Sequence, residues 1–490
     1  MRHDVRFSDF PFSLYAAVGA ALLGSLQFGF HLGVMNTPLQ FIAEDLRFSL
    51  EKGSALVTSA LLVGAAVGSL VAGQAADKFG PKQSLLFNNL LFVVGSSLTS
   101  TTPLGLYGMA TGRLLSGLAC GAASLYVPRY VSEVAPPGIR GTLSTGSQVM
   151  VTVGALLAYC LGWPYAKERA SYISIGSLDV AWWRIMLGMG LVPAIIQMLG
   201  LSACPESPVW LEWVGRGPEA QKAQQKLLGA AAGAVDSSNT PGANGRGDEE
   251  ATQPLTERSS DSGSLSNGEQ GKDEQAGTWG DLLSTRYRRI MLLAAGLPLF
   301  QQGSGINTVI YYSSQVFRDA GLKSPVAGSV AMGASNVVGT LLAAVLMDRI
   351  GRRPLLLFSH SAMAICLLTM SAAQFSPASM EVEGMITLCA ILTYVFSFAL
   401  GVGPIPWVYL PEILPDRIKG RAQAACTSLN WIANLMVGLS FPAMLSALGI
   451  GGAYLLYVAL NVAAVTFAAS YMVETKQRSL AHIKKELIDS

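Results

Sequence analysis

The sequence predicts an all-α membrane protein with twelve transmembrane helices arranged as two six-helix halves. Three observations lead to this prediction: the composition, the number of long apolar stretches, and an internal repeat. Of the 490 residues, 51% are hydrophobic and only 13% are charged, and the mean hydropathy is +0.42. A soluble chain of this length would need more charge to keep its surface in water. We therefore expect the lipid bilayer to surround most of the chain.

Twelve apolar stretches each approach the roughly 20 residues that a helix needs to cross a bilayer. They lie near 13–32, 54–76, 84–100, 104–127, 142–162, 182–203, 290–311, 326–346, 354–374, 385–405, 421–442 and 449–472. Residues 216–280 interrupt the series and are rich in Ser, Gly, Asp and Glu. Such a segment buries too little apolar surface to offset its ordering entropy. We expect an N-terminal half (1–210), a largely disordered cytosolic linker (211–285), a C-terminal half (286–475) and a cytosolic tail (476–490).

The distribution of charge predicts the orientation. With both termini in the cytosol, about 25 Lys and Arg fall on the inner side and about 6 on the outer side, as the positive-inside rule requires. The net charge of +2 does not indicate a nucleic-acid partner. The six cysteines have no metal-ligand spacing, and we expect no metal, cofactor or enzymatic activity. The first apolar stretch is read as a first helix and not as a cleavable signal.

Two motifs occur once in each half. Glu133-x-x-Pro136-x-x-x-Arg140 returns with identical spacing as Glu412-x-x-Pro415-x-x-x-Lys419, and Asp77-x-x-Gly80 returns as Asp348-x-x-Gly351. Parallel repeats of six helices are typical of one class of transporter. Acids and bases at helix ends can pair while one membrane face is closed and separate when it opens, although the bases could also only mark topology. The predicted gating residues are Asp77, Lys82, Glu133, Arg140, Asp348, Arg352, Arg353, Glu412 and Lys419.

Seven strings carry a resemblance to a known family. They are GRLLSGLACG, YVSEVAPPGIRGTL, PESPVWLEW, QQGSGINTVIYYS, DRIGRRP, GPIPWVYLPEILP and VETKQRSL. Together they resemble the sugar porter family of the major facilitator superfamily, over nearly the whole chain outside the linker. FGFHLGVMN, VFRDAGL and SFALGVGP are most similar to plastidic glucose transporters of plants and algae, and also to the facilitative glucose carriers of animals. The chain departs from the family pattern at Pro81, Val209, Gly303 and Ala399.

The resemblance implies a hexose cargo, and the polar residues within the spans suit one. Asn and Gln donate and accept hydrogen bonds at once, and they are costly in contact with lipid. Gly303 and Gly305 favour an interrupted seventh span in which several amides converge, and Pro404 and Pro406 favour a kink in the tenth. The alternative for each amide is a hydrogen bond between helices. The resemblance implies that the sugar is contacted by Gln148, Gln301, Gln302, Asn307, Asn336 and Trp407, with Trp431 and Asn434 lining the cavity. Tyr311 and Tyr312 are expected to close over the sugar.

Position 31 bears on coupling to protons. Proton-driven members of the family carry an Asp in a GYDxGV-like string, and here the string is GFHLGV, with His31 in that slot. Arg113, which would have paired with the Asp, is expected to bond to carbonyls or polar neighbours. We therefore expect facilitated diffusion of a hexose such as glucose by a monomeric unit. Proton symport and sugar sensing remain alternatives. The expected membrane is the plasma membrane, the plastid envelope or the vacuolar membrane.

Overall fold

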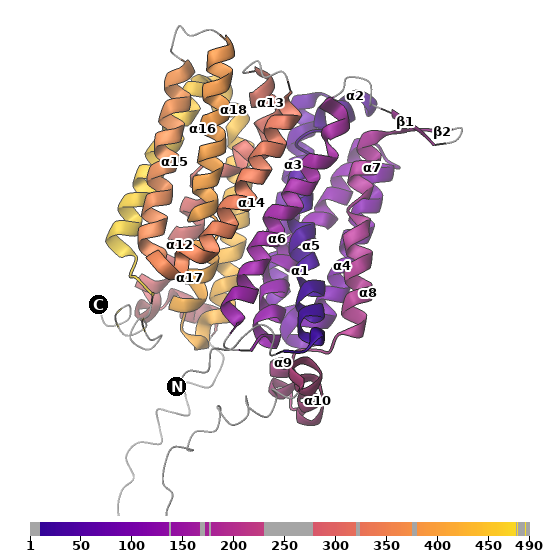
Figure 1. Ribbon diagram of the computed structural model, residues 1–490, viewed down its shortest axis with the longest axis vertical. Coiled ribbons are helices and arrows are strands. Elements are labelled where there is room, and N and C mark those ends of the chain that lie inside the picture. Colours follow the sequence, from indigo (N-terminus) through magenta and orange to yellow (C-terminus); the bar gives the residue numbers. More distant parts are fainter. Residues whose placement is uncertain are drawn as a thin grey trace, which may run out of the picture.

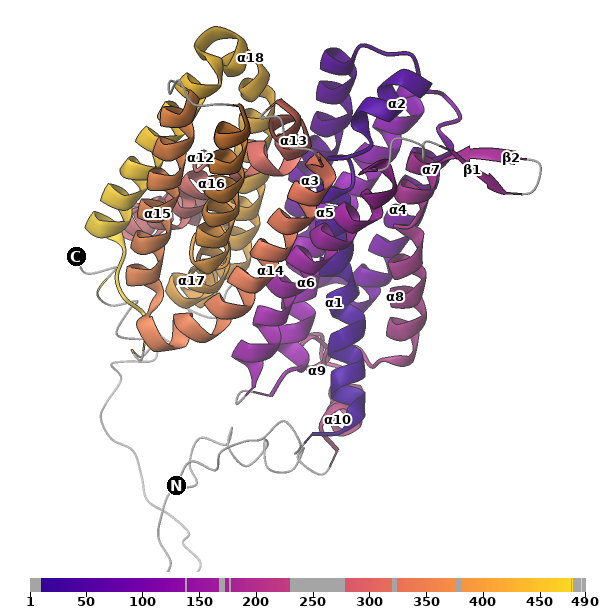
Figure 2. The ribbon, with the colours of Figure 1, turned by 45° about the horizontal axis from the view of Figure 1, so that its top comes forward.

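The computed structural model describes residues 10–136, 139–166, 172–175, 178–229, 278–319, 324–374 and 380–476, together with residues 478 and 486. Figure 1 shows two helical bundles side by side, and Figure 2 shows the same division from a second direction. The start of α1, the helices α9 and α10, and the end of α18 lie at one end of both bundles. We call this the linker end and the opposite end the far end.

The first bundle contains α1 to α8. Its helices are α1 (Phe12–Gly33), α2 (Leu39–Asp45), α3 (Leu50–Phe79), α4 (Pro81–Thr101), α5 (Leu106–Val134), α6 (Arg140–Leu161), α7 (Trp182–Gly188) and α8 (Leu191–Ala203). The second bundle contains α12 to α18. Its helices are α12 (Arg288–Gly303), α13 (Ile306–Asp319), α14 (Pro325–Ile350), α15 (Arg352–Gln374), α16 (Met380–Leu400), α17 (Ile405–Ile413) and α18 (Asp416–Tyr471).

Each of the twelve predicted spans coincides with a helix or a pair of consecutive helices. Spans eleven and twelve are joined in α18, where Gly449 has a φ of 67°. Nine segments of the described chain are long and apolar enough to cross a membrane on their own composition. The predicted spans outside that set, formed by α4, α5 and the pair α12–α13, bury polar groups such as Asn89, Arg113 and Gln301 inside the bundles. Such groups lower a segment's hydropathy and avoid lipid at the same time.

Some elements were not predicted. A two-stranded antiparallel hairpin, β1 (Tyr172–Ile175) and β2 (Leu178–Ala181), lies at the far end after the short helix η2 (Trp163–Ala166). It is a small exception to the all-α prediction.

The expected linker is also helical at both of its ends. Its described parts form α9 (Pro208–Trp213), α10 (Gly217–Leu228), η5 (Trp279–Leu283) and η6 (Thr285–Tyr287). The helix α10 buries Ala220, Ala223 and Leu227, and Ser13 Oγ donates to the carbonyl of Lys226 at 2.6 Å. An apolar face packed on α9 and α1 explains this order. The rest of the expected disordered linker, 230–277, lies outside the described residues.

The bundles meet mainly along two pairs of helices, α3 with α18 and α6 with α14. Each bundle buries its own apolar cluster, but Tyr159 of α6 packs in the second cluster and Trp431 of α18 packs in the first. Ser69 and Ser428 place their hydroxyl oxygens 2.8 Å apart across the interface. These contacts position polar side chains from both bundles along the plane between them.

Further contacts join the bundles toward the far end. Asn36 Nδ2 donates to the carbonyl of Ile310 at 2.5 Å, and Ser329 Oγ donates to Asn36 Oδ1 at 3.3 Å. Arg318 of α13 donates to the side chain of Gln40 on α2. Among the described residues, the ion pairs at the linker end stay on one side of the interface. The far end therefore has polar contacts that join the bundles, in addition to the contact of Ser69 with Ser428.

Candidate functional site

The break in span seven lies between α12 and α13. The helix α12 ends at Gly303, α13 begins at Ile306, and Gly305 has a φ of 90°. A Cβ atom at Gly305 would lie 2.8 Å from the ring of Tyr457. Backbone conformation and space therefore both require glycine here, and the predicted interruption of this span is confirmed.

A second break faces the first. The helix α16 ends at Leu400 and α17 begins at Ile405, as the prolines of span ten predicted. Gln301 Nε2 donates to the carbonyls of Val402 and Gly403 within the break, at 2.9 and 2.8 Å. An interrupted helix leaves carbonyl groups without their usual partners, and Gln301 satisfies two of them. One amide thus holds the two interrupted spans together.

Three predicted amides join in one network. Gln302 Nε2 donates to Asn430 Oδ1 at 3.0 Å, and Asn430 Nδ2 donates to Gln301 Oε1 at 2.8 Å. Asn307 Nδ2 donates to Gln302 Oε1. All four side chains are buried. Asn430 joins α18 to α12 and was not among the predicted site residues. Its place in the span that carries Trp431 and Asn434 could have identified it.

The remaining residues of this region come from α13 and α18. Tyr311 Oη donates to Asn434 Oδ1 at 3.1 Å, and the ring of Trp431 lies 5.3 Å from that of Phe28. Trp431 therefore contacts α1 of the opposite bundle. The side chain of Tyr312 lies outside what the structure describes.

Three predicted contact residues lie apart from the amide network. Gln148 on α6, Asn336 on α14 and Trp407 on α17 are each half-buried. The side chains of Gln148 and Asn336 form no hydrogen bond with the described residues. Because α6 and α14 pack against each other across the interface, both amides occupy helices that line the plane between the bundles.

His31, the residue predicted to bear on coupling to protons, lies in a buried aromatic environment. His31 is 3% exposed, its ring stacks on Phe92 with centroids 5.2 Å apart, and its Nε2 lies 3.4 Å from Ser96 Oγ. Arg113 Nη1 donates to the backbone carbonyl of His31 at 2.8 Å. The expectation that Arg113 would bond to a carbonyl is confirmed.

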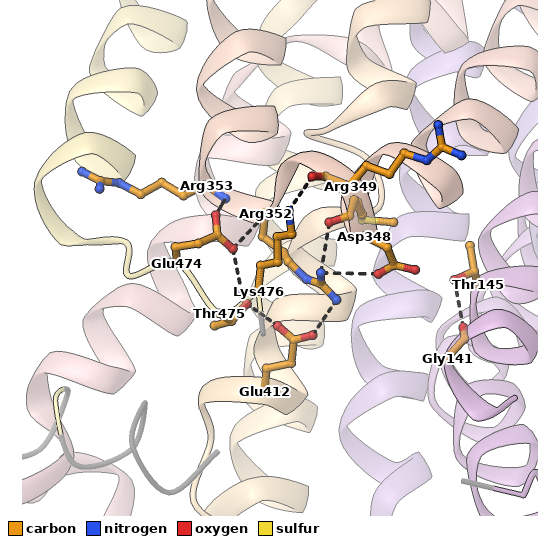
Figure 3. A network of polar contacts seen from close by, with 11 residues as sticks. Gly141, Thr145, Asp348, Arg349, Arg352, Arg353, Glu412, Glu474, Thr475 and Lys476 are labelled. Carbon is orange, nitrogen blue, oxygen red and sulfur yellow. Dashed lines mark hydrogen bonds and ion pairs between the residues drawn. The ribbon is translucent and has the colours of Figure 1, made fainter. Parts of the chain in front are cut away.

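Asp348, Arg352 and Glu412 of the second bundle form one cluster, shown in Figure 3. Arg352 lies 3.1 Å from Glu412 and 3.5 Å from Asp348, and its Nη1 donates to the carbonyl of Met347 at 3.0 Å. Glu412 also accepts a hydrogen bond from Thr475 at 2.6 Å. Arg353 is tied by its Nη2 to the carbonyl of Ala469. This pairing connects α14, α15 and α17 within the second bundle, and the predicted role in gating stays a prediction.

The first bundle has a corresponding cluster. Asp77 lies 2.7 Å from Arg129, which also lies 2.8 Å from Glu133. Lys82 donates to the carbonyl of Cys204 at 2.7 Å, and Arg140 donates to that of Ala135 at 3.3 Å. Lys419, the repeat counterpart of Arg140, is half-buried. Arg129 was not predicted, because it lies four residues before the repeated motif.

Two further carboxylates at the linker end were also missed. Glu206 accepts hydrogen bonds from the backbone N–H of Lys82 and Gln83 at 2.9 and 3.2 Å, and Glu474 accepts from Arg352 and Arg353, both at 3.0 Å. Each caps the first turn of a helix, where N–H groups lack partners. Burial raises the pKa of the Glu206 carboxyl, although the backbone donors and the nearby Lys82 act to lower it. The sequence feature that could have identified both residues is an acid just after the last span of each half.

Comparison with known proteins agrees with this arrangement. The family model "Sugar (and other) transporter" matches residues 16–487. Plastidic glucose transporter 4 of Arabidopsis thaliana is 38% identical over 473 residues, covering 96% of this chain and 80% of that protein. Facilitated glucose transporter member 3 of solute carrier family 2 from Rattus norvegicus is 30% identical over 490 residues, covering 96% and 92%.

A solved structure extends the comparison to the fold. The proton:xylose symporter XylE of E. coli, bound to 6-bromo-6-deoxy-D-glucose, superposes with a TM-score of 0.77 at 25% identity, covering 97% of this chain and 99% of that one. The two bundles and their interrupted helices thus have the major facilitator architecture, and the chain belongs to the sugar transporter family.

Proposed function

We propose that the protein is a facilitative hexose carrier, with glucose as its cargo, that works by alternating access. The observation that carries this proposal is the buried network of Gln301, Gln302, Asn307 and Asn430 between two interrupted helices. Its members are neutral groups that both donate and accept hydrogen bonds. A sugar hydroxyl needs the same pairing, and a neutral cargo needs no balancing charge.

The proposed site extends from this network to the plane between the bundles. Gln148, Asn336, Trp407, Trp431 and Asn434 complete it, and Tyr311 and Tyr312 cover it. Trp431 offers an aromatic face for the apolar side of the sugar, and Tyr311 is already held by Asn434. Half-buried Gln148 and Asn336 supply the contacts from α6 and α14.

Alternating access is supported by where the bundles touch. The far-end contacts of Asn36 with Ile310 and Ser329 join the bundles, while the carboxylate–arginine clusters at the linker end remain within each bundle. We assign the linker end, with both termini, to the cytosol from the distribution of Lys and Arg. With this orientation, the far-end contacts would close the outer face of the proposed carrier. One chain in the lipid bilayer is the proposed transport unit, in a plastid envelope, plasma membrane or vacuolar membrane.

Uniport is supported by the surroundings of position 31. The Arg113 guanidinium is bonded to the carbonyl of His31, a backbone group that does not exchange protons. Proton symport is the second candidate, because the chain shares the fold of a solved proton:xylose symporter over almost its whole length. Glucose carriage is in turn supported by the names of its plastidic and mammalian relatives.

Counterflow in liposomes tests the proposal. Vesicles that contain the purified protein and unlabelled glucose are given labelled glucose, with and without an imposed proton gradient. Entry that is rapid and independent of the gradient is the expected result. Accumulation that follows the gradient would establish symport, and folded protein without counterflow of any hexose would overturn the proposed cargo and favour a sensor.

A further inference from the structure

The two clusters at the linker end differ in where their arginine comes from. We call Asp77, Arg129 and Glu133 the first cluster, and Asp348, Arg352 and Glu412 the second cluster. The repeat makes Asp77 the counterpart of Asp348, and Glu133 the counterpart of Glu412. The arginines are not counterparts. Arg352 follows Gly351 directly, and the residue that follows Gly80 is Pro81; Arg129 lies four residues before Glu133, and Val408 lies four before Glu412.

We infer that Arg129 replaces, from α5, the bridging arginine that Pro81 cannot supply from the start of α4. Arg129 contacts both repeat carboxylates, with its Nη1 2.7 Å from Asp77 Oδ1 and its Nε 2.8 Å from Glu133 Oε1. Arg352 contacts both carboxylates of the second cluster, with Nη2 3.1 Å from Glu412 and Nη1 3.5 Å from Asp348. In each cluster, the two repeated carboxylates thus contact a single guanidinium. It comes from α5 in the first cluster and from α15 in the second.

The hydrogen bonds of the two capping glutamates show that positions 81 and 352 are structural equivalents. Both begin their helices after a glycine with positive φ, 88° at Gly80 and 107° at Gly351. Glu474 accepts from the first two N–H groups of α15, those of Arg352 and Arg353. Glu206 accepts from Lys82 and Gln83, one residue further along α4. Proline has no N–H, which accounts for this shift of one residue.

A cation is needed between the carboxylates of the first cluster. Glu133 has a side chain that is 15% exposed, and its neighbour Asp77 belongs to the adjacent helix α3. A shielded carboxylate beside a second acid is unfavourable unless a positive group lies between them. Lys82 does not fill this role, because its Nζ donates to the carbonyl of Cys204 and pairs with neither Asp77 nor Glu133 in the described structure. Arg129 is therefore the cation that joins Asp77 of α3 to Glu133 of α5.

An arginine from α5, in place of one at the start of α4, changes which helices the cluster connects. Arg352 belongs to α15 and reaches α14, through Met347 and Asp348, and α17 through Glu412. Arg129 belongs to α5 together with Glu133 and reaches only α3, through Asp77. The first cluster therefore ties two helices where the second ties three, and α4 depends on Glu206 alone among these carboxylates. Arg129 acts as a positioning residue for the conformational change.

The test compares two arginine substitutions and a rescue. Arg129→Leu removes the bridge, and Pro81→Arg in the same chain returns an arginine to the place that it occupies in the second bundle. Arg216→Leu is the matched control, because it also removes an arginine–glutamate pair at the linker end, at 2.6 Å from Glu219, outside both clusters. Each variant is reconstituted, and the half-saturation concentration for glucose is measured at both membrane faces.

We expect Arg129→Leu to change the ratio of the two half-saturation concentrations by about threefold to tenfold, because a shift in conformational populations changes apparent affinity on each face. The double variant should return at least halfway to the wild-type ratio, and Arg216→Leu should keep it. A merely structural role would lower the maximal rate and leave the ratio unchanged. An unchanged ratio in Arg129→Leu, or a double variant as altered as the single one, would overturn the inference.

A second measurement does not depend on the proposed function. Amide hydrogen exchange reports local opening of the last turns of α3 and α5 whatever the cargo is. Arg129→Leu should accelerate exchange there at least threefold, with exchange in α14 and α17 unchanged, and Pro81→Arg should slow it again. Unchanged exchange would overturn the role of Arg129. Altered exchange in a protein without glucose counterflow would leave the inference standing and remove only the proposed cargo.

Discussion

The first helices of the two bundles bury amides in different ways. The helix α1 runs without interruption from Phe12 to Gly33, and its Gln27 donates to Asn89 and Gln197 of its own bundle. The helix α12 stops at Gly303, and its Gln301 and Gln302 bond to the second break and to α18. In α1, Gln27 bonds only to side chains among the described residues, and the carbonyl of Ala21 accepts from Gln197 Nε2 at 3.0 Å within the same bundle, so these amides serve packing. A break brings carbonyls and amides together.

The comparison predicts an asymmetric binding site. The second bundle should supply most contacts to the sugar, and the first should supply a stable wall. Matched substitutions in the two bundles can test this difference. The largest effect on transport is expected in the amide network, and the smallest at the contact between the bundles.

Gln302→Ala should have the largest effect. It removes the donor to Asn430 Oδ1 and the acceptor for Asn307 Nδ2, and it removes a proposed contact to the sugar. Loss of a buried hydrogen bond costs about 1–3 kcal/mol, so the KM for glucose should rise about tenfold to hundredfold at near-normal abundance. The control is Gln197→Ala in the first bundle, which should reduce folded protein and keep KM. Parallel losses of folded protein and activity in Gln302→Ala would favour a packing role.

Gly305→Ala should come next. Alanine at a φ of 90° costs about 1–2 kcal/mol, and its Cβ would also press on the ring of Tyr457. Thermal unfolding in detergent should show a less stable protein with slower glucose entry. Gly19→Ala in the uninterrupted α1, where a Cβ would meet nothing within 4 Å, should be neutral or slightly stabilising. Equal stability of both variants would argue against a required break.

His31→Asp sharpens the comparison at the level of coupling. The new carboxylate would lie close to Arg113, which already bonds to the carbonyl of residue 31. A group that exchanges protons near a guanidinium should give glucose transport a pH dependence of a few fold between about pH 5 and 8, where the wild-type rate should be flat. Initial rates across this range measure the effect. A flat profile in the variant would remove the support for coupling at this position.

Ser428→Ala should have the smallest effect. It removes the 2.8 Å contact with Ser69 across the interface, worth about 1 kcal/mol. The ratio of half-saturation concentrations at the two faces should change by less than about fivefold. Ser124→Ala, whose hydroxyl bonds to Gly121 of its own helix, should leave that ratio unchanged. Equal effects of both substitutions would mean that the contact between the bundles does not set the conformational balance.

Local chemistry explains how much the sequence alone could predict. Apolar length predicted the spans, and the glycines and prolines of spans seven and ten predicted both breaks, because each acts on its own backbone. The residues that depend on distant partners were harder. Asn430 and Glu206 act through residues more than 100 positions away, and spacing along the chain carries no information on such pairs. Arg129 was missed because its counterpart, Val408, has no charge.

The connection between the last two spans has a practical consequence. The chain changes direction at Gly449, within the segment Asp416–Tyr471 that is otherwise helical. A reporter peptide inserted there would have no loop to absorb it and would push the two spans apart. The hairpin of β1 and β2 projects from the first bundle at the same end, which makes it the better place for an epitope or a fluorophore that follows the carrier on the far side of the membrane.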